Sequence, residues 1–286
     1  MLNNKSYVNG EWVKGLGKSF ANINPSDTKD IISEYNECDS NQFNQAVEAA
    51  KKAQIEWASV GIEKKSNILI NIGNELISKS KEIGELLSRE EGKTLPEGIG
   101  EVARAGQQFQ YYGAECLRMA GEKIPSTRPG YQVEITREPI GIIGIISPWN
   151  FPIAIPAWKA APALMCGNAV ILKPASLTPA SAIALTEIIA TQDLPAGLFN
   201  LIIGSGSGIG NQIATSPEIP AITFTGSVEV GKSLYADASP LLKKMQMEMG
   251  SKNPLLVLDD ADLPTAINCA ANGAYGGTGQ KCTASS

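Results

Sequence analysis

The sequence contains no histidine among its 286 residues. A Cys-His or Ser-His catalytic pair therefore cannot form within the chain, and acid–base chemistry near neutral pH must come from a carboxylate, a lysine or water. The five cysteines are widely scattered, and none belongs to a C-x-x-C pair. This distribution argues against a disulfide framework and against a metal site, and favours one reactive thiol among buried ones.

The chain also lacks a surplus of basic residues, and its formal net charge is −5. Because phosphate binding requires a concentrated positive face, this balance argues against nucleic acid as a partner. No stretch approaches the roughly 20 apolar residues that a membrane span needs, and the first residues lack the apolar core of a secretory signal. We therefore expect no membrane partner and a cytoplasmic location.

The first part of the sequence predicts a small β element followed by helices. Residues 7–13 alternate around the pair Asn9-Gly10, which is typical of a tight hairpin turn. From residue 41 to about residue 118, apolar residues recur at helical spacing. This stretch predicts three long helices, with breaks near Gly61 and at 92–96.

The rest of the sequence alternates between strands and helices. Strands are expected at 131–137, 139–146, 169–172, 199–203 and 221–224, and helices at 179–190, from 207 and from 227. Such alternation predicts an α/β protein with a doubly wound, Rossmann-like parallel sheet, covered by helices on both faces and preceded by the N-terminal helices. An expected strand at 255–258 and an expected helix at 263–275 begin another α/β unit, which needs more strands than the remaining residues supply.

Two residues near the end of the chain are candidates for nucleophilic chemistry. Cys282 lies in the run Gly-Gln-Lys-Cys-Thr, and Glu248 is a lone carboxylate upstream of it. A thiol served by a carboxylate base is a pairing that a chain without histidine can still form. The alternatives are that Cys282 is a small buried apolar residue and that Glu248 is a buried partner of a lysine.

Several polar residues follow expected strands, where ligands of a doubly wound sheet bind. Lys173 and Ser176 follow one strand, and Gly226 and Ser227 end another and open a helix, a position suited to a phosphate. An ordinary loop lysine and a serine helix cap are the alternatives. The glycine-rich stretch 204–210 has a similar context, but its spacing does not match G-x-G-x-x-G.

The segment Pro148-Trp149-Asn150-Phe151-Pro152 follows the most apolar expected strand. Prolines on both sides restrict the backbone around Asn150, so its amide is a candidate donor to a developing oxyanion. As an alternative, Trp149 and Phe151 pack in the core while Asn150 satisfies a turn.

Taken together, these motifs resemble, in order and spacing, those of the NAD(P)-dependent aldehyde dehydrogenases. The resemblance extends from the hairpin to the end of the chain. It departs from the family in two respects. Relatives often carry glycine at the position of Ser251, and their chains continue for about as many residues as would complete a second α/β domain. The motifs that carry the resemblance are Pro-Trp-Asn-Phe-Pro at 148–152, Lys-Pro-Ala at 173–175, Phe-Thr-Gly-Ser at 224–227, Met-Glu-Met-Gly-Ser-Lys at 247–252 and Gly-Gln-Lys-Cys at 279–282.

The resemblance implies a role for each candidate. Cys282 adds to an aldehyde and passes through a thiohemiacetal and a thioester, Asn150 holds the oxyanion, and Glu248 activates the water that releases a carboxylic acid. The cofactor is NADP or NAD. The residues implied to bind it are Trp149 beside the cleft, Lys173 and Ser176 at the adenosine ribose, and Gly226 and Ser227 at the pyrophosphate.

Ser176 is informative because many relatives that prefer NAD carry a glutamate at this position. A neutral serine removes a charge that would repel the 2′-phosphate, so we expect NADP to be accepted. The sequence Gly-Gln-Lys-Cys-Thr-Ala around Cys282 and the serine at 176 resemble those of the branch of the family that acts on short aldehyde acids, such as 2-oxoglutarate semialdehyde or succinate semialdehyde.

The resemblance also predicts a division of the chain. Residues 1–118 and 139–249 form the NAD(P)-binding domain, 119–138 form oligomerisation strands, and 250–286 begin an incomplete catalytic domain. A homodimer or homotetramer is implied for the complete protein. Two other functions fit the sequence: a truncated, inactive cofactor-binding fragment, and a reductase acting on an acyl phosphate through a cysteine.

Overall fold

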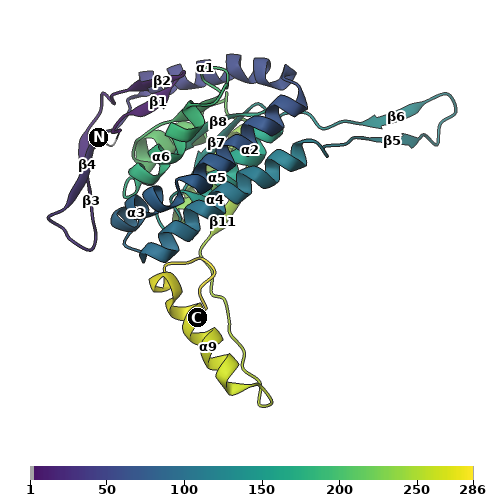
Figure 1. Ribbon diagram of the computed structural model, residues 1–286. Coiled ribbons are helices and arrows are strands. Elements are labelled where there is room, and N and C mark those ends of the chain that lie inside the picture. Colours follow the sequence, from purple (N-terminus) through teal and green to yellow (C-terminus); the bar gives the residue numbers. More distant parts are fainter. Residues whose placement is uncertain (1–2, 286) are drawn as a thin grey trace.

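The computed structural model describes residues 3–285, which fold around a seven-stranded sheet. From one edge to the other the strand order is β11-β10-β7-β8-β9-β1-β2. Figure 1 labels β7 and β8 in the body of the molecule, with β1 and β2 on one side of them and β11 on the other. The strands of this sheet are β1 (Ser6–Val8), β2 (Glu11–Val13), β7 (Ile142–Ile146), β8 (Ala169–Lys173), β9 (Phe199–Leu201), β10 (Ala221–Gly226) and β11 (Lys244–Met249).

The direction of winding reverses inside this sheet. The chain runs from β7 outward through β8 to β9 and then returns to the other side of β7, where β10 and β11 add in parallel. The N-terminal hairpin closes the far edge, where β1 pairs with β9 and with β2 in antiparallel fashion. The predicted α/β, doubly wound class is confirmed, with an antiparallel edge added. The point of reversal lies between β7 and β10, and ligands of such sheets bind there.

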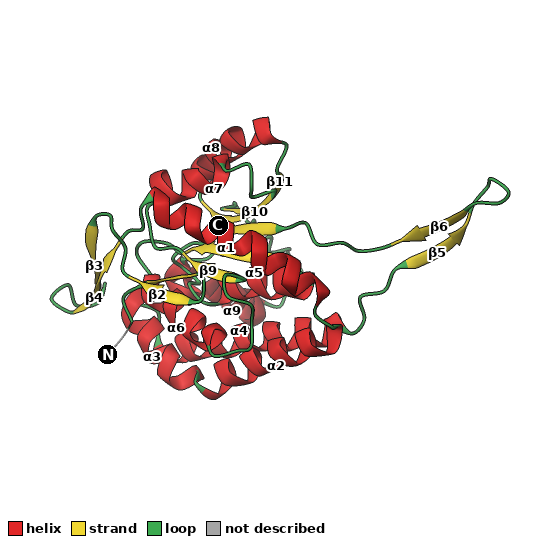
Figure 2. Cartoon of the chain, turned by 90° about the horizontal axis from the view of Figure 1, so that it is seen from above, coloured by secondary structure: helices red, strands yellow, loops and turns green. Residues whose placement is uncertain are grey.

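The apolar composition of the central strands explains why they lie in the middle of the sheet. β7 and β8 are buried along their whole length and are rich in isoleucine, valine and leucine, as expected for parallel strands covered on both faces. Figure 2 shows α7 (Asn211–Thr215) and α8 (Val228–Ala238) on one side of the strands. On the other side lie α2 (Ile62–Ser78), α3 (Ser80–Glu91) and α4 (Leu95–Cys116).

Four helices, rather than the predicted three, occupy the segment after the hairpin. α1 (Ser40–Ser59) and α2 separate near Gly61 as predicted, and α4 begins after Gly92, whose φ of 94° suits a helix end. The break at Lys79 between α2 and α3 was not predicted, because neither glycine nor proline marks it. The predicted apolar faces of these helices are buried in the core, including Trp57, Leu69 and Leu87.

The later helices follow the predicted alternation closely. α6 (Pro179–Ala190) and α9 (Leu263–Tyr275) coincide with their predicted ranges. The helix expected from residue 207 begins as a π-helical turn at Gly206–Gly210 before α7. α5 (Ala154–Met165), which follows the Pro-Trp-Asn-Phe-Pro segment, was not predicted. Short 3-10 turns lie at Ser239–Leu241 and Gly276–Gly279.

Four strand assignments differ from the sequence prediction. The expected strand at 255–258 is wrong: these residues are irregular and exposed, because no described strand lies beside them to pair with. Conversely, β11 was not predicted, nor was the antiparallel pair of β3 (Ser19–Ile23) and β4 (Ile31–Asn36).

Two segments project from the body of the molecule. β5 (Glu122–Pro125) and β6 (Gln132–Ile135) form an extended antiparallel arm, and the segment from residue 250 carries α9 away from the sheet (Figure 1). None of the residues of α9 is buried. Within the described residues 3–285, no helix combines the length and apolar character needed to cross a membrane.

Candidate active site

A cleft opens at the carboxyl ends of β7, β8 and β10, at the point where the winding reverses. Its volume is about 530 Å³. All five predicted cofactor residues line this cleft together with the predicted catalytic residues Asn150 and Cys282. The five are Trp149, Lys173, Ser176, Gly226 and Ser227.

The backbone at the end of β10 is suited to a phosphate group. Ser227 caps α8, and its Oγ accepts a hydrogen bond from the backbone N–H of Val230 at 3.2 Å. Gly226 cannot carry a side chain without rearrangement, because a Cβ would lie 2.5 Å from the ring of Phe224. The cleft therefore combines a helix N-terminus with bare backbone at the same point.

Buried hydroxyl groups add to this fit. The hydroxyls of Ser147 and Thr225 are buried, line the cleft, and have no hydrogen-bond partner within residues 3–285. A buried polar group without a partner is costly unless a ligand or water satisfies it. Together with the capped helix, these groups fit the sugar and phosphate oxygens of a dinucleotide.

Lys173 lies at the end of β8 with little exposure. Its Nζ donates hydrogen bonds to the backbone carbonyls of Pro174 at 2.7 Å and Gly204 at 3.2 Å. Burial lowers the pKa of Lys173 to about 8, and the charge of Glu37 opposes this effect. Because the part of the chain that the structure describes places no carboxylate in an ion pair with it, the ammonium can still attract an anionic ligand at the cleft.

Cys282 is exposed, and three cavities meet at it. One is the cleft just described. The second has a volume of about 560 Å³ and contains Glu248, and the third has a volume of about 350 Å³ and lies against α4. The predicted nucleophile is therefore open to a dinucleotide on one side and to a small substrate on the other.

The loop that carries Cys282 is held by side chains from three parts of the chain. The Asn150 amide donates to the Gln280 carbonyl at 2.9 Å, and Glu97 of α4 accepts from the Gly277 N–H at 2.9 Å. Asn253 donates to the carbonyl of Cys282 at 2.7 Å. An amide nitrogen has two N–H donors, so Asn150 retains one for an oxyanion after bonding to Gln280.

The segment that contains Asn150 is itself tied to α4. Lys93 Nζ donates to the backbone carbonyl of Asn150 at 2.9 Å and to Glu101 at 2.6 Å. Glu101 in turn accepts from the N–H groups of Ile153 and Ala154, each at 3.1 Å, where α5 begins. These buried contacts fix the position of the amide more firmly than the flanking prolines alone.

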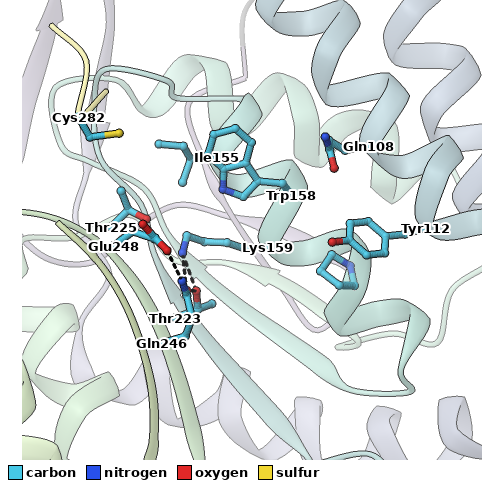
Figure 3. A pocket seen from close by; sticks show the side chains of 11 residues that line it. Gln108, Tyr112, Ile155, Trp158, Lys159, Thr223, Thr225, Gln246, Glu248 and Cys282 are labelled. Atoms are coloured by element: carbon cyan, nitrogen blue, oxygen red, sulfur yellow. Dashed lines mark hydrogen bonds between the residues drawn. The ribbon is translucent and has the colours of Figure 1, made fainter. Parts of the chain in front are cut away.

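Glu248 extends from β11 into the second cavity (Figure 3). Its Oε1 accepts a hydrogen bond from the Gln246 amide nitrogen at 2.9 Å. The Gln246 oxygen accepts from Lys159 Nζ at 3.0 Å and from the Thr223 hydroxyl. Burial lowers the pKa of Lys159 to about 8, while the negative charge of Glu248 opposes that shift. A buried amine is thus linked through an amide to the predicted base.

The sequence did not single out Lys159, Gln246, Glu97 or Asn253. Lys159 lies inside an apolar helix, and only its three-dimensional neighbours reveal a role. Gln246 precedes Glu248 by two residues, which places both side chains on one face of β11. That spacing could have drawn attention to Gln246 if β11 had been predicted.

Comparison with known proteins is consistent with this arrangement. A sequence model described as the aldehyde dehydrogenase family matches residues 12–286. Alpha-ketoglutaric semialdehyde dehydrogenase of Bacillus subtilis is 41% identical over 282 residues, covering 98% of this chain and 58% of that protein. Alpha-ketoglutarate semialdehyde dehydrogenase of Haloferax volcanii is 39% identical over 283 residues, covering 99% of this chain and 59% of that protein.

A solved structure is also similar. A double mutant of betaine aldehyde dehydrogenase from Staphylococcus aureus, in complex with NAD+, superimposes with a TM-score of 0.96 at 31% identity, covering 99% of this chain and 58% of that one. The chain thus spans less than two thirds of the length of these relatives. The family predicted from the motifs is confirmed by the match over residues 12–286: this chain belongs to the aldehyde dehydrogenase family.

Proposed function

We propose that the complete protein oxidises an aldehyde to a carboxylic acid with NADP+ or NAD+, through a covalent intermediate on Cys282. The observation that carries this proposal is the meeting of three cavities at one exposed thiol, with Glu248 in one cavity and the predicted cofactor residues in another. A relative named for semialdehyde oxidation and a similar structure in complex with NAD+ support the same activity.

The residues divide the chemistry as follows. The Cys282 thiolate forms a bond to the aldehyde carbon, and the carbonyl oxygen becomes an oxyanion that accepts hydrogen bonds from the Asn150 amide and the Cys282 N–H. Bound NAD(P)+ supplies the acceptor for the hydride that leaves this carbon. Glu248 removes a proton from water, whose oxygen then attacks the thioester and releases the acid and the thiol.

Contacts around Glu248 support its role as the base. The Lys159 ammonium polarises the amide of Gln246, which donates to the carboxylate. This network holds Glu248 within the cavity that it shares with Cys282. The Gln246 amide donates to the carboxylate and the Lys159 ammonium is already protonated, so the proton taken from water stays on Glu248 until it leaves to solvent in the cavity.

The proposed substrates are short aldehyde acids such as 2-oxoglutarate semialdehyde and succinate semialdehyde. The test is an assay of the complete gene product with these aldehydes, NAD+ or NADP+, and measurement of both products. We expect one equivalent of carboxylic acid for each reduced cofactor. Formation of aldehyde from an acyl phosphate, without acid formation from aldehyde, would instead support a reductase, and binding of cofactor with no turnover would support an inactive fragment.

Ser176 gives a prediction about the choice of cofactor. In the loop after β8 it is exposed beside Lys173, and the loop is anchored by a 2.8 Å hydrogen bond from Asn22 to the Leu177 carbonyl. Replacement of Ser176 by glutamate should raise the KM for NADP+ at least about 10-fold, because a carboxylate repels the 2′-phosphate. The KM for NAD+ should stay equal or fall. Steady-state kinetics with each cofactor measure both effects.

The matched control is Ser176→Ala, which shortens the side chain without adding charge. It should change the KM for NADP+ by less than about threefold, since a single exposed hydrogen bond contributes little. If the glutamate variant changed the KM for NADP+ and the KM for NAD+ by the same factor, Ser176 would not face the 2′ position of the ribose.

We further propose that the complete protein is a homodimer or homotetramer. The β5–β6 arm extends from the body (Figure 2). Its apolar side chains Ile124, Tyr131 and Ile135 are exposed, and among the described residues its two strands pair only with each other. The unpaired backbone groups along the outer edges of such strands can form hydrogen bonds with a strand of a second subunit. The mass of the assembly in sedimentation analysis tests this, and a monomer would contradict it. A cytoplasmic location stays a prediction from the sequence.

A further inference from the structure

The cavity between α4 and the Cys282 loop contains a cation that the proposed chemistry does not use. This cavity, of about 350 Å³, is lined by Cys282 and Asn150. Arg104 of α4 lines it as well. Other charged side chains line the same cavity. A side chain that already has a hydrogen-bond or ion-pair partner in the protein is less available to a ligand, so the partners of these side chains determine which of them can bind one.

The carboxylates of this cavity already have partners. Glu101 accepts from Lys93 and from two backbone N–H groups at the start of α5. Glu97 accepts from Thr94 and from the Gly277 N–H, and Glu91 accepts from the Lys93 N–H at 2.9 Å. These acidic groups hold the protein together, and Lys93 is committed to the same network. Lys281 also lines the cavity, but its side chain lies against Gly276 and Gly277 in the loop of Cys282 itself, where its charge contributes to lowering the pKa of Glu97.

Arg104 is not committed in this way. Its guanidinium makes one long hydrogen bond, 3.3 Å from Nη1 to Gln107 on the same helix, and within residues 3–285 it forms no ion pair. A guanidinium carries five N–H donors, in a geometry that matches the two oxygens of a carboxylate. Arg104 therefore retains the capacity to bind an anion in this cavity.

Part of the cavity wall is apolar. Phe151, Ala154, Ile155 and Trp158 line the same cavity. A ligand that fits has a carbonyl at the thiol, methylene groups against these side chains and an anionic group at the guanidinium. A short ω-oxo carboxylate has these three parts in this order, whereas a neutral aldehyde of equal length leaves the exposed guanidinium of Arg104 to water.

We propose that Arg104 binds the carboxylate of an ω-oxo acid whose aldehyde carbon reacts with Cys282. This inference rests on the proposed function and assigns its substrate specificity to one side chain. Arg104 contributes to recognition of the acid and takes no part in bond formation. Its loss therefore acts on substrate binding, and mainly on KM, rather than on the steps at the thiol.

The experiment compares an acid and a neutral aldehyde of the same length in the complete protein. For Arg104→Met, kcat/KM with succinate semialdehyde should fall roughly 10- to 100-fold, mostly through KM, while kcat/KM with butanal should change by less than about threefold. Arg104→Lys, which keeps the charge but not the paired donors, should lie between the two. The control Arg118→Met makes the same replacement just beyond the end of α4, at an exposed arginine outside this cavity.

Each outcome has a distinct meaning. Equal losses with succinate semialdehyde and butanal would overturn the assignment, since they indicate a structural effect of the substitution. An unchanged kcat/KM with the acid would also overturn it. Failure of the unmodified complete protein to oxidise either aldehyde would instead overturn the proposed function itself, and the assignment with it.

Discussion

Replacement of Cys282 by alanine should abolish aldehyde oxidation by the complete protein, lowering kcat at least about 10⁴-fold, as expected when a covalent nucleophile is removed. No other thiol can substitute for it: the remaining cysteines of the described residues line neither the cofactor cleft nor the two cavities beside it. Histidine is absent from the sequence as an alternative nucleophile. Absorbance of the reduced cofactor measures the loss.

Cofactor binding separates this effect from unfolding. Trp149 is 39% exposed beside the cleft, so its fluorescence should report NADP+ binding to the Cys282→Ala variant with an unchanged Kd. Cys269→Ala is the matched control, because Cys269 is also exposed but lies on α9. Retention of more than about 1% of the original kcat by the Cys282 variant would be incompatible with covalent catalysis at this residue.

Local sequence patterns were sufficient where an element is determined by its own residues. The Asn9-Gly10 pair adopts positive φ at both positions, as a tight hairpin of this kind requires. The helix at 179–190 begins with Pro179, and the helix at 263–275 is capped by the side chain of Asp262. Both signals are local in the sequence. The strands β7, β8, β9 and β10 were likewise predicted from the alternation of strands and helices along the sequence.

Prediction failed where an element depends on distant partners. The apolar run 255–258 has the composition of a strand but no described neighbour to pair with, whereas β11 forms because β10 offers it an edge. The break at Lys79 reflects how α2 and α3 pack against α4 rather than a local stop signal.

The residues of the candidate site also fall into those that local sequence reveals and those that depend on distant partners. Residues carried by short motifs, such as Asn150 and Cys282, could be named from the sequence. Lys159 and Arg104 could not, because each is an isolated basic residue on a helix and gains significance only from the cavity that it lines. Lys159 contacts Thr223 and Gln246, which are more than fifty positions away, and Arg104 lines the same cavity as the distant Cys282. No sequence spacing encodes either meeting.

Glu248→Gln should have the second largest effect, and its effect should fall on one half of the reaction. Glutamine occupies the same volume and can still accept a hydrogen bond from Gln246, but it cannot take a proton from water. We expect a burst of about one equivalent of reduced cofactor per active site, followed by a steady-state rate lowered about 10²- to 10⁴-fold, the range typical of a lost general base.

Rapid mixing of the variant with aldehyde and NADP+ measures the burst and the steady state together. Glu85→Gln, at an exposed position on α3 away from the cavities, is the matched control and should leave both unchanged. A covalent adduct with the mass of the acyl group should accumulate on Cys282 in the Glu248 variant, because acylation continues while hydrolysis stops. Loss of the burst itself would show instead that Glu248 is needed before the thioester forms, as a base for the thiol, and the water-activating role would have to be given up.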